Sequence, residues 1–163
     1  MPMVVRKART EDAHALALVV AAVAEEGFLG AEPPVDIEDR AQVLRETIAG
    51  EGRAAAWALE DGGSVVGMAS VGERFRGVLQ LGMAIVPAAR GRGGGRALLE
   101  AIMEHASVTG AHKVELEAWT DNGRAIAFYS AAGFEVEGIR RDHYRRRDGR
   151  LRSSILMARQ LAR

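Results

Sequence analysis

The segment that most limits how this chain can fold runs from residue 78 to residue 119. Residues 78–86 form a β-type run, and the glycine-rich segment 87–100, PAARGRGGGRALLE, follows it and opens an alanine- and leucine-rich helical pattern. Residues 113–119 then alternate between polar and apolar side chains, as a strand does. Strand, helix and strand in this order predict a right-handed crossover that pairs the two strands in parallel.

Helices and strands alternate along the remaining chain. Strands are predicted at residues 3–6, 54–60, 64–70, 134–144 and 151–161, and further helices at residues 11–25, 37–49 and 122–132. Thr10 and Asp36 are residue types that cap helix N-termini, and we expect them to begin the first two helices. This order of elements predicts a mixed sheet in an α/β or α+β arrangement, and 163 residues fit one domain over residues 1–163.

Composition argues against several classes of function. The 22 Lys and Arg residues balance the 22 Asp and Glu residues, and a neutral total argues against a general nucleic-acid or membrane-surface binder. The chain has no cysteine, which excludes disulfides, thiolate catalysis and cysteine-based zinc sites and fits a reducing compartment. The four histidines, at positions 14, 105, 112 and 143, lack metal-ligand spacing, so we expect no metal site.

No segment of the sequence is predicted to enter a membrane. The longest apolar-rich run, residues 13–24, is interrupted by His14 and is shorter than the roughly 20 apolar residues that a spanning helix needs. The N-terminal residues MPMVVRKARTEDA lack the apolar core of a signal peptide. We therefore expect a cytoplasmic protein.

The glycine segment is suited to bind an anion. Four of the five residues from Gly91 to Gly95 are glycine, and backbone N–H groups at a helix start are free to bind phosphate. Arg90, Arg92 and Arg96 add cationic donors. A Walker A loop needs a lysine that is absent here, and the dinucleotide pattern fails where Arg96 replaces its third glycine. The simpler alternative is a tight strand-to-helix turn with solvated arginines.

Two motifs resemble those of one known family. Arg90-x-x-Gly93-x-Gly95 resembles the Arg/Gln-x-x-Gly-x-Gly/Ala loop that binds the acyl-CoA pyrophosphate in the GNAT N-acetyltransferases. Residues 121–134 resemble that family's Asn-x-x-Ala-x-x-x-Tyr-x-x-x-Gly-Phe motif, with matches at Asn122, Ala125, Tyr129, Gly133 and Phe134. Together with the order of the elements, the resemblance covers residues 4–161.

The resemblance implies both a fold and an activity. The fold is α/β (α+β), with a mixed, mostly antiparallel sheet of six to seven strands that splays between two central parallel strands and is flanked by about four helices. The activity is acetyl-CoA-dependent N-acetylation, with direct transfer to a primary amine of a small molecule, an amino acid or a protein N-terminus. Direct transfer is the simpler mechanism because no cysteine can carry an acyl group.

The resemblance also implies how acetyl-CoA binds. The pantetheine arm enters the gap between the parted strands and contacts the backbone from Met83 to Val86, and the pyrophosphate binds the amides from Gly91 to Arg96. Gly94 is not required by the motif, and we expect it to be merely tolerated. The residues assigned to the cofactor are Met83, Ala84, Ile85, Val86, Arg90, Gly91, Arg92, Gly93, Gly94, Gly95, Arg96, Asn122, Ala125 and Tyr129.

Tyr129 and Glu117 are the main candidates for proton transfer. Tyr129 is expected to protonate the leaving CoA thiolate, although a packed ring with its hydroxyl in water is the alternative. Glu117 shares a strand face with Glu115 and is expected to take the proton of the amine, unless that face is only solvated. Glu73 is a rival base, as are the neighbouring acids at positions 25 and 26.

The acceptor side of the protein has few motifs. Trp119 and Phe28 are predicted either to line the acceptor pocket or to join the core. Residues 140–152, RRDHYRRRDGRLR, hold seven arginines, a pattern that is typical of a solvated hairpin. A border of the acceptor site, a dimer contact and a nucleic-acid patch are the alternatives for this segment.

Two other functions remain open beside the transferase. One is a non-catalytic acyl-CoA sensor or toxin-like module that keeps the cofactor loop, and the other is an RNA-directed member of the same fold that uses the arginine-rich hairpin. For the transferase, the expected partners are acetyl-CoA, an amine acceptor and a second copy in a homodimer, with neither nucleic acid nor membrane.

Overall fold

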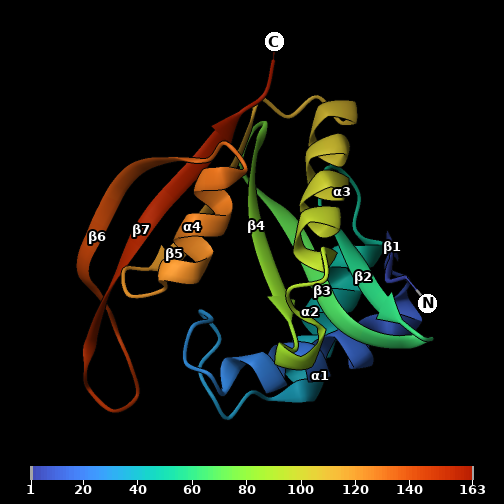
Figure 1. Cartoon of the computed structure of the whole chain (residues 1–163), viewed down its shortest axis with the longest axis horizontal. Helices are drawn as coiled ribbons and strands as arrows, with labels where there is room; N and C mark the ends of the chain where they lie inside the picture. The colour runs from blue at the N-terminus through green and yellow to red at the C-terminus, as the bar shows by residue number, and fades with distance from the viewer. Residues whose placement is uncertain (1, 163) are drawn as a thin grey trace.

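A seven-stranded mixed sheet forms the centre of the structure, a computed structural model that describes residues 2–162 (Figure 1). Its strands are β1 Val4–Lys7, β2 Ala55–Asp61, β3 Ser64–Phe75, β4 Val78–Ile85, β5 Lys113–Trp119, β6 Glu135–Arg145 and β7 Leu151–Gln160. The helices are α1 Ala13–Ala24, α2 Ile37–Ala49, α3 Gly94–Val108 and α4 Gly123–Ala131. The strand order is β1-β2-β3-β4-β5-β7-β6, which confirms the predicted mixed sheet.

The two parallel strands part soon after they begin. β4 pairs with β5 only where residues 78–80 face residues 113–115. Beyond that point β4 remains paired with β3 as far as Ile85, and β5 remains paired with β7 as far as Trp119. Each strand thus follows its antiparallel neighbour, and the sheet splays between β4 and β5 as predicted.

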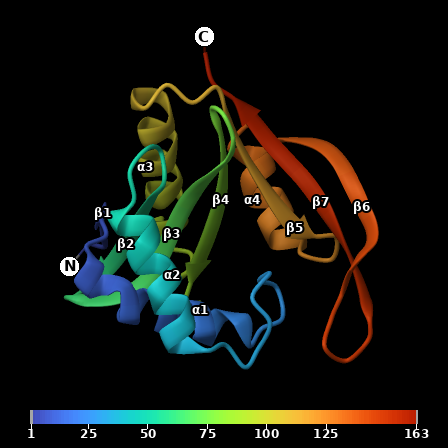
Figure 2. The ribbon, with the colours of Figure 1, turned by 180° about the vertical axis from the view of Figure 1, so that it is seen from behind.

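The helices cover the two faces of the sheet in separate layers. Figures 1 and 2 show α3 and α4 on one face and α1 and α2 on the other. Leu98 and Ile102 of α3 pack with sheet residues such as Leu79 in the larger core cluster. In the second cluster, Leu16 of α1 packs with Met68 of β3. The side chains at the centre of each cluster are fully buried. Helices therefore pack on the parted strands from both faces of the sheet.

Most of the predicted elements are confirmed within a few residues. α2 and β5 have the predicted bounds, and Asp36 caps α2 by accepting a hydrogen bond from the Asp39 N–H at 2.9 Å. The prediction for Thr10 is wrong, because Thr10–Asp12 form a separate turn of 3₁₀-helix and α1 begins after it. The Asp12 carboxylate holds that turn by accepting a hydrogen bond from the Arg9 N–H at 2.7 Å.

The glycine segment is shaped by two different constraints. Gly91 and Gly93 have φ angles of +74° and +88°, the left-handed region that glycine adopts without strain. Gly94 is needed for packing instead, since a Cβ atom there would lie 2.6 Å from Cδ2 of the buried Leu59. The expectation that Gly94 is merely tolerated is therefore wrong. The start of α3 lies so close to β2 that a hydrogen atom is all that fits.

Substitution of Gly94 by alanine tests this close approach. The new methyl group must displace the Leu59 side chain from a packed core, so we expect Gly94→Ala to lower the free energy of unfolding by about 1–3 kcal/mol in urea denaturation. Gly123→Ala is the matched control, because a Cβ atom at Gly123 meets nothing within 4 Å. Equal stability of the two variants would contradict the close packing of α3 on β2.

Candidate active site

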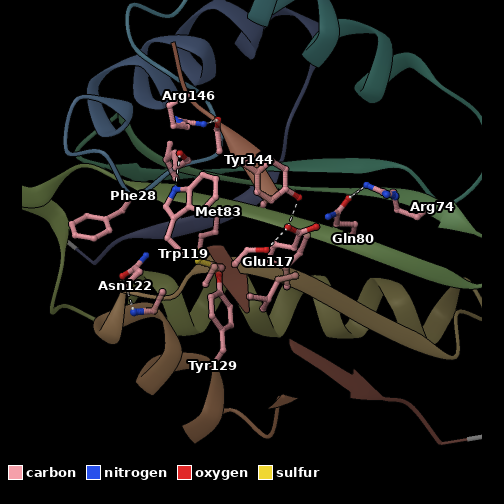
Figure 3. A pocket seen from close by; sticks show the side chains of 18 residues that line it. Phe28, Arg74, Gln80, Met83, Glu117, Trp119, Asn122, Tyr129, Tyr144 and Arg146 are labelled. Atoms are coloured by element: carbon pink, nitrogen blue, oxygen red, sulfur yellow. Dashed lines mark hydrogen bonds between the residues drawn. The ribbon is translucent and has the colours of Figure 1, made fainter. Parts of the chain in front are cut away.

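Two cavities open where β4 and β5 part, and Tyr129 lines both. The first, which we name the β5 cavity, has a volume of about 360 Å³ (Figure 3). The residues that line this cavity and not the second include Arg74, Gln80, Glu117, Trp119, Tyr144, Arg146 and Ser154. The second, which we name the glycine-loop groove, has a volume of about 420 Å³ and is lined by Glu26, Ile85, Arg90, Gly91, Gly93, Gly94, Gly95, Arg96 and Arg124. Their shared wall is formed by Phe28, Leu29, Met83, Asn122, Ala125 and Tyr129.

The start of α3 presents hydrogen-bond donors to the glycine-loop groove. The Ala97 N–H donates to the Gly93 carbonyl oxygen at 3.1 Å, so the amides of residues 94–96 precede the first hydrogen bond of the helix. These amides and the helix dipole present positive charge to the groove, and the Arg96 side chain adds a cation. This end of the groove can therefore hold a phosphate or pyrophosphate.

Arg90 joins three parts of the groove. Its Nη1 donates to Oε1 of Glu26 at 2.8 Å, and its Nε donates to the Ile85 carbonyl oxygen at 2.8 Å. The hydrogen bond from Arg90 holds the pKa of Glu26 below its usual range. Glu26 is therefore an anchor for Arg90 rather than a free base, and the expectation that it competes for that role is wrong.

The other cations near the loop differ from the prediction. Arg92 pairs with Asp61 at 2.6 Å and does not line the groove, so the expectation that its side chain reaches the phosphates is wrong. Arg124, in the first turn of α4, lines the groove and was missed. Its place inside the Asn122 motif was visible in the sequence, but the direction of its side chain follows only from how α4 packs.

The backbone of β4 faces the gap left by β5. The Val86 N–H donates to the Val66 carbonyl oxygen at 2.9 Å, so this amide belongs to the β3 ladder, and Val86 does not line the groove as predicted. Because hydrogen-bonding direction alternates along an antiparallel pair, the N–H groups of Met83 and Ile85 and the Met83 carbonyl point toward the gap. Residues 83 and 85 can thus pair with an extended ligand.

Tyr129 is held at the junction by its ring. The side chain is 8% exposed, and the ring packs edge-to-face on Phe128 and Phe134 at centroid distances of 5.0 and 5.5 Å. Burial raises the pKa of the Tyr129 hydroxyl well above its ordinary value. The hydroxyl is therefore protonated at neutral pH and can donate a proton to a group in either cavity.

Glu117 lies in the β5 cavity at the centre of a hydrogen-bond network. Its Oε1 accepts from Arg140 Nη1 at 2.6 Å, and its Oε2 accepts from the Tyr144 hydroxyl at 2.5 Å and the Ser154 hydroxyl at 2.9 Å. The Glu117 side chain is 17% exposed and Ser154 is 1% exposed. The alternative of a merely solvated face does not apply to Glu117.

Neither of the two remaining rival bases lies at the site. Glu73 accepts a hydrogen bond from the Gly77 N–H at 2.7 Å and pairs with Arg53 at 2.7 Å, and these donors, the amide first, lower the pKa of Glu73. Glu73 lies at the turn between β3 and β4 and lines neither cavity, so its prediction as a base is wrong. Glu25 is exposed and also lines neither cavity.

The arginine-rich hairpin borders the β5 cavity. The guanidinium groups of Arg146 and Arg152 lie over the Trp119 ring, 5.1 and 4.4 Å from its centroid, and Trp119 Nε1 donates to the Leu29 carbonyl oxygen at 3.1 Å. Trp119 is both buried and part of the cavity wall, whereas Phe28 is half-exposed and lines both cavities. The prediction of a solvated hairpin is corrected to the acceptor-border alternative.

The sequence analysis missed Tyr144, Arg146 and Arg74 as wall residues of the β5 cavity. Between the pairs Arg140–Ser154 and Tyr144–Arg152, β6 has two more residues than β7, so the strand bulges there. Arg140 and Tyr144 still lie on one face, since both bind Glu117. No local sequence signal marks such a bulge.

Two further findings describe the chain away from the cavities. Within residues 2–162, no cluster of three or more His, Asp or Glu side chains is arranged to hold a metal ion. In the same range, no helix is long and apolar enough to cross a membrane. His105 has a structural role, since its Nε2 hydrogen-bonds the Arg53 carbonyl oxygen at 2.9 Å.

Similarity to known proteins agrees with this geometry. The chain is 33% identical over 112 residues to the L-methionine sulfoximine/L-methionine sulfone acetyltransferase of Pseudomonas aeruginosa, a match that covers 66% of this chain and 64% of that relative. The chain thus spans less than two thirds of the length of this relative. A ribosomal-protein-alanine N-acetyltransferase from Brucella melitensis has a similar structure, with a TM-score of 0.84, 28% identity and 97% of this chain and 99% of that chain covered.

Two more comparisons concern the fold and the family of the chain. The structure of a phosphinothricin acetyltransferase from Sinorhizobium meliloti, solved in complex with AcCoA, shares the fold at a TM-score of 0.86 and 23% identity, covering 99% of this chain and 90% of that one. The model of the acetyltransferase (GNAT) family matches residues 6–134, well over half of the chain. The chain therefore belongs to the GNAT acetyltransferase family.

Proposed function

We propose that this protein is an acetyl-CoA-dependent N-acetyltransferase that transfers the acetyl group directly to the primary amine of a small amino acid. The observation that carries this proposal is the position of Tyr129, whose side chain lines both the glycine-loop groove and the β5 cavity. One cavity offers an anion site beside free strand backbone, and the other offers a carboxylate. A thioester and an amine can therefore meet at Tyr129.

The glycine-loop groove fits acetyl-CoA, the acyl donor of this family. The amides of residues 94–96, together with Arg96 and Arg124, provide donors for the pyrophosphate. The backbone of Met83 and Ile85 provides hydrogen bonds for the amides of the pantetheine arm, and an N–H of this strand can stabilise negative charge on the thioester oxygen. Asn122 and Ala125 form the opposite wall of the groove, beside Tyr129.

Tyr129 and Glu117 supply the two proton transfers that amide formation needs. The leaving thiolate takes a proton from the Tyr129 hydroxyl, which its raised pKa keeps protonated. The proton of the amine passes to the Glu117 carboxylate on the opposite side of the β5 cavity. A direct transfer of this kind needs no covalent intermediate on the enzyme.

The charges of the β5 cavity favour a free amino acid as acceptor. Figure 3 shows Arg74 and Arg146 at opposite ends of the cavity, with Glu117 between them. Arg74 donates to the neutral Gln80 side chain at 3.0 Å, and within residues 2–162 it has no carboxylate partner. It is therefore available to a substrate carboxylate while Glu117 attracts the ammonium group. The Pseudomonas aeruginosa relative is named for amino-acid analogues, which supports this class.

A protein N-terminus is the second candidate acceptor. A more open cavity of about 700 Å³ adjoins the β5 cavity at Phe28 and Arg146, and it could admit the chain that follows an N-terminal residue. The name of the Brucella melitensis neighbour supports this class. The free guanidinium of Arg74 favours the amino acid, because the residue at a protein N-terminus has no carboxylate to pair with it.

Replacement of Tyr129 by phenylalanine tests the transferase against a non-catalytic acyl-CoA sensor. Loss of the general acid is expected to lower kcat by about 10²-fold or more, measured as CoA thiol release. The dissociation constant of acetyl-CoA should stay within about threefold of the wild-type value, since the ring is kept. Unchanged kcat in Tyr129→Phe would contradict the role of the hydroxyl.

Replacement of single arginines near the glycine-rich turn tests which of them bind the pyrophosphate. A charge-assisted hydrogen bond contributes about 1.5–3 kcal/mol, so we expect Arg124→Ala to weaken acetyl-CoA binding by about tenfold or more in calorimetry. Arg92→Ala is the matched control, because Arg92 lies outside the groove and pairs with Asp61. A larger effect of Arg92→Ala than of Arg124→Ala would reverse the assignment.

A pair of related amines tests the acceptor class. Arg74→Ala should raise KM about tenfold for an amino acid and leave KM unchanged for the amine that lacks its carboxylate, because the ion pair with the substrate is lost. Arg76→Ala serves as control, because Arg76 lies two residues beyond Arg74 in the β3–β4 hairpin and lines neither cavity. Equal effects of Arg74→Ala on both substrates would exclude carboxylate binding by Arg74.

An RNA-directed enzyme is not supported by the contacts of the arginine-rich hairpin. Arg146 and Arg152 are engaged with Trp119, and Arg147 donates to the Pro33 carbonyl oxygen at 3.1 Å. These side chains hold the protein's own wall rather than forming an open stripe of cations. The expected homodimer stays a prediction.

A further inference from the structure

Glu117 is poorly placed to take a proton from the substrate by itself. A carboxylate has about four lone-pair positions for hydrogen bonds, and three of those on Glu117 are occupied by Arg140, Tyr144 and Ser154. Ser154 and Tyr144 both bind Oε2, and Arg140 binds Oε1. The one position left is on Oε1, where a substrate amine would lie beside the Arg140 guanidinium.

Tyr144 offers a second acceptor in the same cavity. Its one hydroxyl proton is donated to Glu117 Oε2 at 2.5 Å, and its oxygen accepts from Arg140 Nη1 at 3.1 Å. One lone pair of that oxygen remains, and Tyr144 lines the β5 cavity in which the amine binds (Figure 3). The ring is fixed edge-to-face on Trp119 at a centroid distance of 5.3 Å. The hydroxyl is thus oriented by contacts on both ends of the side chain.

We propose, resting on the transferase function above, that Tyr144 is the catalytic residue that contacts the amine and relays its proton to Glu117. The ammonium group first releases one proton to solvent. As the neutral amine nitrogen bonds to the thioester carbon, a second proton moves from nitrogen to the Tyr144 oxygen and the Tyr144 proton moves to Glu117 Oε2. The carbon–sulfur bond breaks, and the sulfur takes the proton of Tyr129. Solvent then returns a proton from Glu117 to Tyr129, so protons and charge balance over the cycle.

The surroundings of Tyr144 suit a neutral relay. Arg140 and His143 lie beside it on β6, Glu117 binds it from β5, and Arg74 and Arg146 line the same cavity. Burial and the hydrogen bond to Glu117 raise the pKa of the Tyr144 hydroxyl, so it works as a phenol and not as a tyrosinate. The Arg140 guanidinium, bound to both oxygens, stabilises the negative charge as it moves between them.

A double-mutant cycle on the full-length protein tests the relay. We expect Tyr144→Phe and Glu117→Gln each to lower kcat by about 10²-fold, and the double variant to lose no more than either single variant, because the two groups move one proton as a unit. The dissociation constant of acetyl-CoA should stay at the wild-type value, whereas a disturbed structure would change it. Glu135→Gln, on the exposed start of β6, is the control for removal of a carboxylate from this sheet.

The outcomes separate the relay from the function on which it rests. If Glu117 accepts the proton directly, Tyr144→Phe frees a lone pair of Oε2 and keeps more than about a third of the wild-type kcat, which overturns the relay alone. Losses that multiply in the double variant also overturn it. If the wild-type protein releases no CoA thiol with any amine of a broad panel, the transferase function fails and the relay fails with it.

Discussion

The parting of β4 from β5 is the constraint on which the rest of the site depends. The two strands share only the pairing of residues 78–80 with residues 113–115, although each is bound along its other edge by an antiparallel neighbour. Beyond that point each strand follows its own neighbour, so the edges that face the gap stay unpaired. The backbone of Met83 and Ile85 is thereby left facing a ligand, and both cavities open from the same gap.

Charge pairing organises the walls of that gap. Arg90 binds Glu26 at the end of α1, and Arg140 binds Glu117 on β5, so cations and carboxylates near the ligands are already oriented. The segment 27–34 between α1 and α2 is held by the far hairpin, through Arg146 to the Gly30 carbonyl and the Arg147 N–H to Glu32. The acceptor side is thus built from segments more than one hundred residues apart in the sequence.

The cofactor side could be predicted from the sequence, and the acceptor side could not. Gly93 and Arg96 occupy a local motif whose geometry follows from a strand, a turn and a helix start, and Tyr129 belongs to a second local motif on α4; all three line the glycine-loop groove. Tyr144 reaches the β5 cavity from beyond a bulge in β6, and Arg74 reaches it from the end of β3. Neither leaves a local pattern that single-sequence reasoning can use.

By itself, the sequence determined the crossover, the glycine-rich turn that opens α3 and the family. The turn and the two family motifs depend on backbone conformation and short spacings, and the crossover depends on the order of strand, helix and strand. Only the tertiary structure decided that Gly94 is required by Leu59, that Arg92 turns to Asp61 and that Glu117 is enclosed by three donors. Such contacts join residues far apart in the chain, and their partners are chosen by packing once the sheet has formed.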